Sequence, residues 1–171
     1  EVGGGKLMAS GAPGSSEKAF QAFVQTFAPT HLVTLLCTSE NHFEGLEKAC
    51  EGAGVGWTHL PISGAKALLS EQRNPDDAES LRRIPELERL LAQGERVIIH
   101  CAAGMHRTGF VCYVVCRLSG LGPEAALAKV RETRALTADE LVVARRGPDG
   151  NKSQVLVDSA EALVGDLLLR Q

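Results

Sequence analysis

Residues 96–119 constrain the fold most strongly, because a short apolar run, a tight loop and a helical run follow one another there. Residues 96–99, RVII, have the length and composition of a buried strand, and the run 109–119 has those of a helix. The connecting loop begins HCAAGMHRTG. This order directs backbone N–H groups at an anion and places a helix N-terminus beneath it. The segment therefore predicts an anion-binding loop inside an α/β fold.

Two side chains of this loop carry its chemistry. Cys101 opens the loop and Arg107 closes it, six positions later. A thiol in such a loop is driven toward thiolate, since comparable sites lower a cysteine pKa from about 8.5 to roughly 3.5–7.5. The planar fork of Arg107 can grip two oxygens of one phosphate group. We therefore expect Cys101 to act as a nucleophile that forms a phosphocysteine, with Arg107 holding the phosphate.

The segment matches the HC-x5-R-[ST] signature and so resembles the cysteine-dependent protein phosphatases. The short chain resembles their dual-specificity branch. This resemblance implies a phosphate site built from the backbone amides of Ala102, Ala103, Gly104, Met105, His106 and Arg107. It further implies that Thr108 hydrogen-bonds the sulfur and that His100 orients the loop from behind. No metal and no cofactor is expected, because His and Asp clusters at metal-ligand spacing are absent.

The rest of the chain predicts one domain, 1–171, with a central, mainly parallel sheet flanked by helices and the loop placed between the last strand and a helix. The predicted strands span residues 6–10, 32–37, 55–61 and 96–99. The predicted helices span residues 16–27, 41–52, 74–93, 109–119, 123–133 and 155–169, and Pro85 indicates a break in the third. Residues 62–74 and 146–153 are predicted loops. The chain begins without Met, so residues 1–5 are read as a fragment end or as non-native.

Composition limits the partners and the compartment. The chain carries a net charge of −3 and no strongly basic segment, which argues against a nucleic-acid partner. Nothing approaches the roughly 18 consecutive apolar residues of a membrane span. Five cysteines without framework spacing point to a reducing compartment, so a cytoplasmic location is expected.

The sequence does not identify the residue that donates a proton to the leaving group. In the resembled phosphatases an aspartate follows the strand that here reads WTHLPI, but Ser63-Gly64 stand in its place. Asp76 and Asp77 come later and are first-turn acids of a predicted helix, which would complement its dipole. Glu71 is a third candidate. The acid is therefore displaced, supplied by the substrate, or missing.

Cys37 closes a predicted strand where several members of the resembled family also carry a cysteine. The carboxyl ends of neighbouring parallel strands meet at one sheet edge, so Cys37 could form a protective disulfide with Cys101. A small core residue is an equally good interpretation. Cys112 and Cys116 share one helix face and are expected in the core, and Cys50 carries no signal.

Three functions fit these residues. The first is hydrolysis of phosphotyrosine, and of phosphoserine or phosphothreonine, in proteins. The second is a phosphoinositide or inositol pyrophosphate phosphatase: the His-Arg-Thr-Gly run resembles plant and fungal members of that kind, although the loop holds no lysine. The third is a catalytically weak phosphate-binding module, suggested by the missing aspartate. The partner is accordingly a phosphorylated protein or a phosphorylated small molecule.

Overall fold

The structure, a computed structural model, describes residues 1–14, 16–40, 45–70, 73–146 and 153–170. Its main sheet is wholly parallel, and its spatial order is β1 (Lys6–Ser10), β4 (Arg96–His100), β2 (His31–Thr34) and β3 (Gly56–His59). The predicted α/β class, a parallel sheet flanked by helices, is confirmed.

The register of the strands brings three loops together at one edge of the sheet. Ser10 and Thr34, the last residues of β1 and β2, both pair with His100, the last residue of β4. The segments that follow these residues therefore leave the sheet side by side, at the edge where parallel sheets carry their sites.

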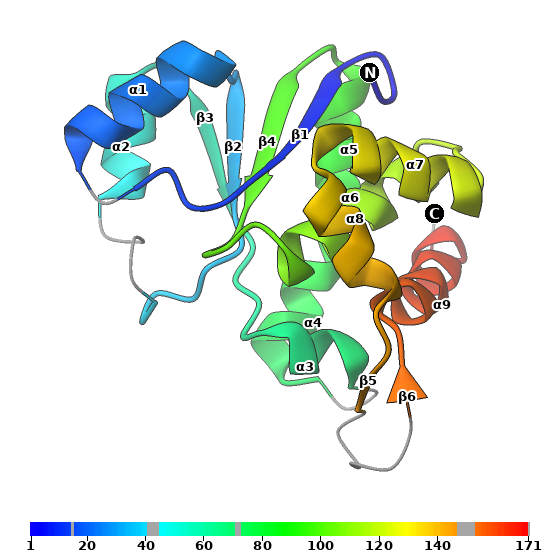
Figure 1. Cartoon of the computed structure of the whole chain (residues 1–171). Helices are drawn as coiled ribbons and strands as arrows, with labels where there is room; N and C mark the ends of the chain where they lie inside the picture. The colour runs from blue at the N-terminus through cyan, green and yellow to red at the C-terminus, as the bar shows by residue number, and fades with distance from the viewer. Residues whose placement is uncertain (15, 41–44, 71–72, 147–152, 171) are drawn as a thin grey trace.

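Successive side chains of a strand point to opposite faces of the sheet, so the core has two parts, one on each face. Leu32 of β2 and Ile98 of β4 are fully buried against α1 (Glu17–Phe27) and α2 (Leu46–Gly52). Their neighbours Val33, Val97 and Ile99 point to the opposite face, where α5 (Ile84–Ala92) and α6 (His106–Leu118) pack. Figure 1 shows these two layers on either side of the sheet.

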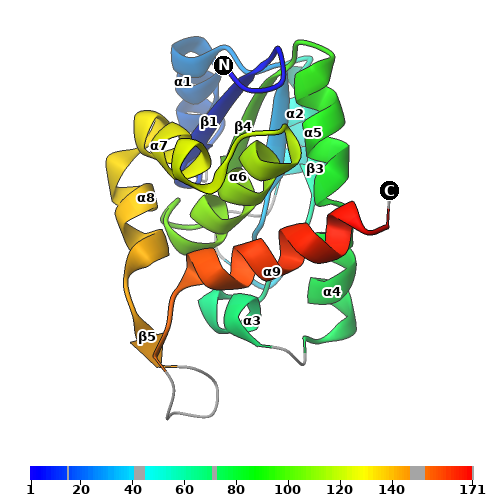
Figure 2. The ribbon, with the colours of Figure 1, turned by 90° about the vertical axis from the view of Figure 1, so that its right-hand side faces the viewer.

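The second half of the chain covers α6. It contains α7 (Pro123–Thr133), α8 (Ala135–Val142) and α9 (Leu156–Leu168), and Figure 2 shows α9 crossing the outer side of α6. Glu161 of α9 accepts hydrogen bonds from Tyr113 Oη at 2.5 Å and from Arg117 Nε at 2.6 Å. These polar contacts fix α9 on the helix that follows the anion-binding loop.

Several element boundaries differ from the sequence prediction. β2 ends at Thr34 instead of residue 37, and beyond it the carbonyl of Leu35 accepts from the N–H of Ile62 at 3.2 Å and from Arg107 Nη1 at 3.2 Å. The predicted loop 62–74 contains a short helix, α3 (Ala65–Leu69). The prediction also missed α8, which begins after one extended residue, Arg134, that breaks a longer helical run at φ −165° and ψ 110°.

Other predicted features hold. The helix predicted for 74–93 is divided at Arg83 into α4 (Pro75–Arg82) and α5, because Pro85 cannot donate to the preceding turn. Residues 41–44 of another predicted helix lie outside the described residues, as do 147–152 of the predicted surface loop. The ends of that loop form a small antiparallel pair, β5 (Arg145–Arg146) with β6 (Ser153–Gln154).

Candidate active site

Cys101 is the first residue after β4 and lies at the edge where the strand ends meet. It is buried, with 4% of its surface exposed. The next carbonyl, that of Ala102, accepts a 3.1 Å hydrogen bond from the N–H of Ala12, in the loop that follows β1. The thiol therefore lies at the base of a loop that neighbouring strand ends support.

Gly104 allows the loop to turn tightly. Its φ is +68°, a left-handed conformation that L side chains rarely adopt. A Cβ at this position would also overlap the carbonyl of Ser10 and the guanidinium of Arg134. Close approach of the loop to β1 and to the start of α8 thus requires glycine here.

The helix that the sequence prediction missed, α8, contributes polar support for this loop. Arg134 Nη1 donates to the carbonyls of Ala103 at 2.6 Å and Gly104 at 2.9 Å, and Thr137 Oγ1 donates to Gly104 at 2.6 Å. His106 Nε2 lies 2.9 Å from Glu140 Oε2. The three supporting residues recur every third position, so they follow one side of the helix. In the sequence, only this spacing indicated that the three residues share one side of a helix.

The surroundings of Cys101 favour the thiolate. Burial raises the pKa of the Cys101 thiol. Hydrogen bonds from the Thr108 hydroxyl and from the N–H groups of Thr108 and Met105, together with the charge of Arg107, outweigh burial and bring that pKa below its ordinary value. The buried Thr108 hydroxyl has no nitrogen or oxygen partner among the described residues, which leaves it available to the sulfur. An anionic sulfur beneath open N–H groups can attack an electrophilic phosphorus atom.

His100 lies behind the loop and is fully buried. Its Nε2 is 2.9 Å from Thr34 Oγ1, which also accepts from Trp57 Nε1 at 2.9 Å. Burial lowers the pKa of His100 to about 4, so the ring is neutral near pH 7. A neutral, fixed imidazole suits the expected orienting role better than proton transfer.

Arg107 has a partner that sequence reasoning missed. Its two terminal nitrogens donate to the carboxylate of Glu40, Nη1 at 2.6 Å and Nη2 at 2.7 Å, and Nη1 also donates to the carbonyl of Ile62 at 2.8 Å. Glu40 comes soon after β2, at the same sheet edge. The sequence shows a carboxylate a few residues after this strand, but nothing in the sequence pairs it with Arg107.

Asp77 holds the segment Ser63-Gly64, which stands where the resembled phosphatases carry an aspartate. This carboxylate accepts from Ser63 N at 2.7 Å, Ser63 Oγ at 2.7 Å and Asn74 Nδ2 at 2.6 Å, and it is 2% exposed. Asp77 therefore joins α4 to residue 63, with hydrogen bonds on both of its carboxylate oxygens. Asp76 is exposed, whereas Glu71 lies outside the described residues.

Cys37 is not at a strand end, because β2 stops three residues earlier. It remains at the correct sheet edge: Leu35 N donates to His100 O at 3.0 Å, one residue before Cys101. Both thiols are free, and each interacts electrostatically with Arg107. Cys112 and Cys116 are fully buried in the core, as predicted, and Cys50 is buried in the other layer.

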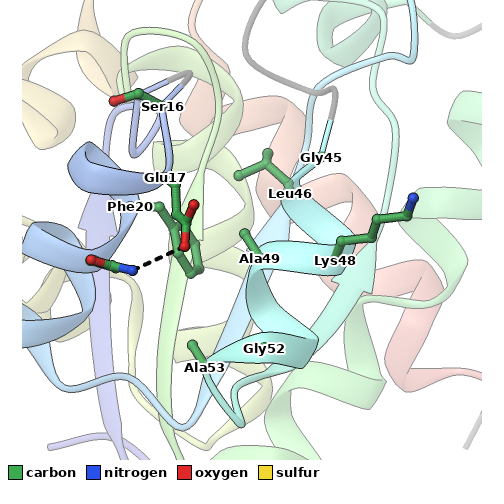
Figure 3. Close-up of a pocket in the computed structure, with 11 residues that line it drawn as sticks. Ser16, Glu17, Phe20, Gly45, Leu46, Lys48, Ala49, Gly52 and Ala53 are labelled. Atoms are coloured by element: carbon green, nitrogen blue, oxygen red, sulfur yellow. Dashed lines mark hydrogen bonds between the residues drawn. The ribbon is translucent and has the colours of Figure 1, made fainter.

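Pockets in the described part of the chain are lined by residues outside the loop. One of about 470 Å³ opens between α1 and α2 (Figure 3), and Phe20, Leu46 and Ala49 are among the residues that line it. Another, of about 340 Å³, lies between Ser63 and Arg73. Within the described ranges, no three His, Cys, Asp or Glu side chains are grouped to hold a metal ion, and no helix is long and apolar enough to cross a membrane.

A family model described as the tyrosine phosphatase family matches residues 5–158. The chain therefore belongs to the tyrosine phosphatase family. The match includes the whole loop from Cys101 to Arg107 and all four strands of the main sheet. A comparison with curated proteins finds no match.

Solved structures share the fold. Tk-PTP in the active form is 24% identical, with a TM-score of 0.58, over 98% of this chain and 94% of that chain. PTPMT1 in complex with PI(5)P is 15% identical, with a TM-score of 0.65, over 96% and 94%. The core catalytic domain of the PP-IP phosphatase SIW14 from S. cerevisiae, in complex with citrate, is 18% identical, with a TM-score of 0.52, over 81% and 80%. These likenesses establish a phosphatase fold.

Proposed function

We propose that residues 1–171 form one phosphatase domain that hydrolyses phosphomonoesters through a phosphocysteine. Cys101 attacks phosphorus, the bond from phosphorus to the leaving oxygen breaks, and water then releases phosphate from the sulfur. Arg107 and the amides of residues 102–107 hold the equatorial oxygens, and Thr108 stabilises the departing thiolate. The single observation that supports this most is the setting of the buried Cys101, which receives hydrogen bonds from Thr108 and from the N–H of Met105 and feels the charge of Arg107.

The proposed substrate is a phosphotyrosine protein, with phosphoserine and phosphothreonine as slower substrates. Residues 102–106 contain no lysine or arginine, and the Nε2 of His106 lies 2.9 Å from Glu140 Oε2. A loop with so little extra positive charge is suited to one phosphate group. A reducing, cytoplasmic location is part of this proposal, since all five cysteines are free.

A second candidate is a phosphoinositide or inositol pyrophosphate. It is favoured by the complex of the PTPMT1 structure with PI(5)P and by the fold shared with SIW14. Release of His106 from Glu140 would leave its ring nitrogen free to hydrogen-bond a second phosphate beside the cradle. Relative kcat/KM on a phosphotyrosine peptide, PI(5)P and an inositol pyrophosphate therefore decides the substrate class, and we expect the peptide to be fastest.

The activity itself is tested on an aryl phosphate. Wild type should turn it over, whereas Cys101→Ser and Arg107→Lys should not, because serine is a poorer nucleophile and an ammonium cannot make the bidentate contact. Cys101→Ser should still bind vanadate. A wild-type protein that binds vanadate without turnover would instead support the binding-module interpretation.

A further inference from the structure

The pocket between α3 and α4 begins one residue from a contact of the phosphate-binding arginine. Arg107 Nη1 donates to the carbonyl of Ile62 at 2.8 Å, and Ser63, the next residue, lines this pocket of about 340 Å³. Figure 1 shows α3 and α4 beyond the carboxyl ends of the strands, the edge at which Cys101 follows β4. One substrate can therefore reach both the loop and the pocket.

Two basic side chains line this pocket from different segments. Leu68 and Leu69 are buried in the core and fix α3, while Lys66 of the same helix is exposed at the pocket. Arg73 comes from the segment before α4 and is half-buried, and its Nη2 donates to the carbonyl of Leu68 at 3.2 Å. Among the described residues, no carboxylate lies within ion-pairing distance of either cation.

The charge of Arg73 is incompletely compensated. Burial lowers the pKa of its guanidinium, and the charges of Asp166 and Asp77 oppose that effect without cancelling it. Asp166 is exposed on α9 and does not line the pocket, so solvent screens its charge. The Nε of Arg73 is closed off from solvent and has no hydrogen-bond partner in the described ranges. A partly buried cation in this state, on the wall of a pocket, favours an anionic guest.

The carboxylate of Asp77 also lines the pocket and limits the charge that a guest can carry. Both of its oxygens are hydrogen-bonded, by Ser63 and Asn74. The two cations, Lys66 and Arg73, exceed this one carboxylate by a single positive charge. A guest carboxylate carries one negative charge and matches that excess, whereas a phosphate group carries nearly two at neutral pH and exceeds it.

We propose that this pocket binds an acidic side chain of the substrate protein, with Lys66 and Arg73 holding its carboxylate. This inference rests on the proposed function and narrows its substrates to phosphotyrosines that have an aspartate or glutamate nearby. The flexible stem of Lys66 brings an ammonium to the carboxylate, while Arg73 offers a planar donor from the wall. The pocket acts in substrate recognition and touches neither the phosphorus nor the sulfur.

The test compares kcat/KM on matched phosphotyrosine peptides. One residue, placed in turn at successive positions on either side of the phosphotyrosine, is glutamate, alanine or phosphoserine. At the best position, wild type should prefer the glutamate peptide to the alanine peptide about fivefold, as expected of a partly exposed ion pair. This ratio should fall as salt is added.

Substitutions then locate the preference. Lys66→Gln and Arg73→Gln should each bring the glutamate-to-alanine ratio toward one, and the ratio cancels any effect that is common to both peptides. Lys48→Gln is the matched control: it removes the same charge from an exposed position on α2, which packs on the opposite face of the sheet, and it should keep the ratio of wild type.

Equal wild-type rates on the glutamate and alanine peptides at every position would overturn the proposal. A preference that survives both substitutions, or that falls equally in Lys48→Gln, would also overturn it. A larger gain from phosphoserine than from glutamate would overturn the assignment of a carboxylate guest. Failure of wild type to hydrolyse any of the peptides would instead refute the proposed function on which the pocket's role rests.

Discussion

The Thr137 hydroxyl donates a 2.6 Å hydrogen bond to the carbonyl of Gly104, which joins α8 to the tightest point of the loop. Both groups are buried, and the same carbonyl also accepts from Arg134 at 2.9 Å. The loop conformation therefore depends on a helix more than 30 residues further along the chain.

Thr137→Val tests this support. Valine keeps the shape and removes the donor, so we expect a loss of about 1 kcal/mol in the free energy of unfolding and weaker vanadate binding. Denaturant unfolding and vanadate titration measure the two effects. Thr133→Val is the control, because the Thr133 hydroxyl bonds the carbonyl of Val130 within α7. Equal effects of the two substitutions on vanadate binding would contradict a specific role for Thr137.

The stability of the protein should depend on pH through His100. Its pKa is about 4 in the folded state against an ordinary 6.5, so folding favours the neutral ring. This contribution is complete above pH 6.5 and is lost as pH falls toward 4, because the unfolded chain binds the proton first. The full loss is about 3 kcal/mol. Between pH 7 and pH 4.5, the free energy of unfolding should fall more in wild type than in His100→Asn. An equal fall in both proteins would disprove the low pKa of His100.

The proton donor can be found from the leaving group and the pH profile. With Ser63-Gly64 in place of an aspartate, aryl phosphates should turn over much faster than phosphoserine, whose alkoxide needs protonation. Equal rates would show that an efficient acid is present. In that case the basic limb of the pH–rate profile should disappear in either Asp76→Asn or Glu71→Gln, but not in both.

Asp77 should behave differently from these candidates. Asn at this position would turn an amide toward Ser63 and Asn74, which now donate to the carboxylate, so Asp77→Asn should lower the melting temperature. The basic limb should remain. Loss of that limb with unchanged stability would make Asp77 the acid and contradict its anchoring role.

Oxidation should be reversible if Cys37 protects Cys101. Peroxide converts a thiolate to a sulfenic acid, which a nearby thiol can capture as a disulfide with release of water. Wild type should then lose activity in mild peroxide and regain it with dithiothreitol, whereas Cys37→Ser should not recover. Peptide mapping identifies the partner. A disulfide from Cys101 to the buried Cys112, or none, would refute the role of Cys37.

The sequence was most informative where the determinants are local. The strand–loop–helix around Cys101 and Arg107, the helix start at Asn74 and the break near Pro85 all follow from nearby residues. The residues that complete the site could not be placed in this way. Glu40 meets Arg107 across 67 positions, and Thr137 meets Gly104 across 33, so only the folded chain brings them together.

α3 and α8 escaped prediction for a related reason. Both are short, and isolated helices of five and eight residues are weak in water, so tertiary packing decides whether they form. Leu68 of α3 and Leu141 of α8 are fully buried in the main core. Their burial is a property of the assembled layers, which the local pattern did not specify.

The phosphocysteine is the central claim, and acid quenching during turnover of an aryl phosphate tests it most directly. Mass spectrometry of the digested protein should show a phosphate adduct on the Cys101 peptide. No other peptide should carry it, and Cys101→Ser should show neither adduct nor turnover. Ordinary turnover by Cys101→Ser, or an adduct on another residue, would contradict the account.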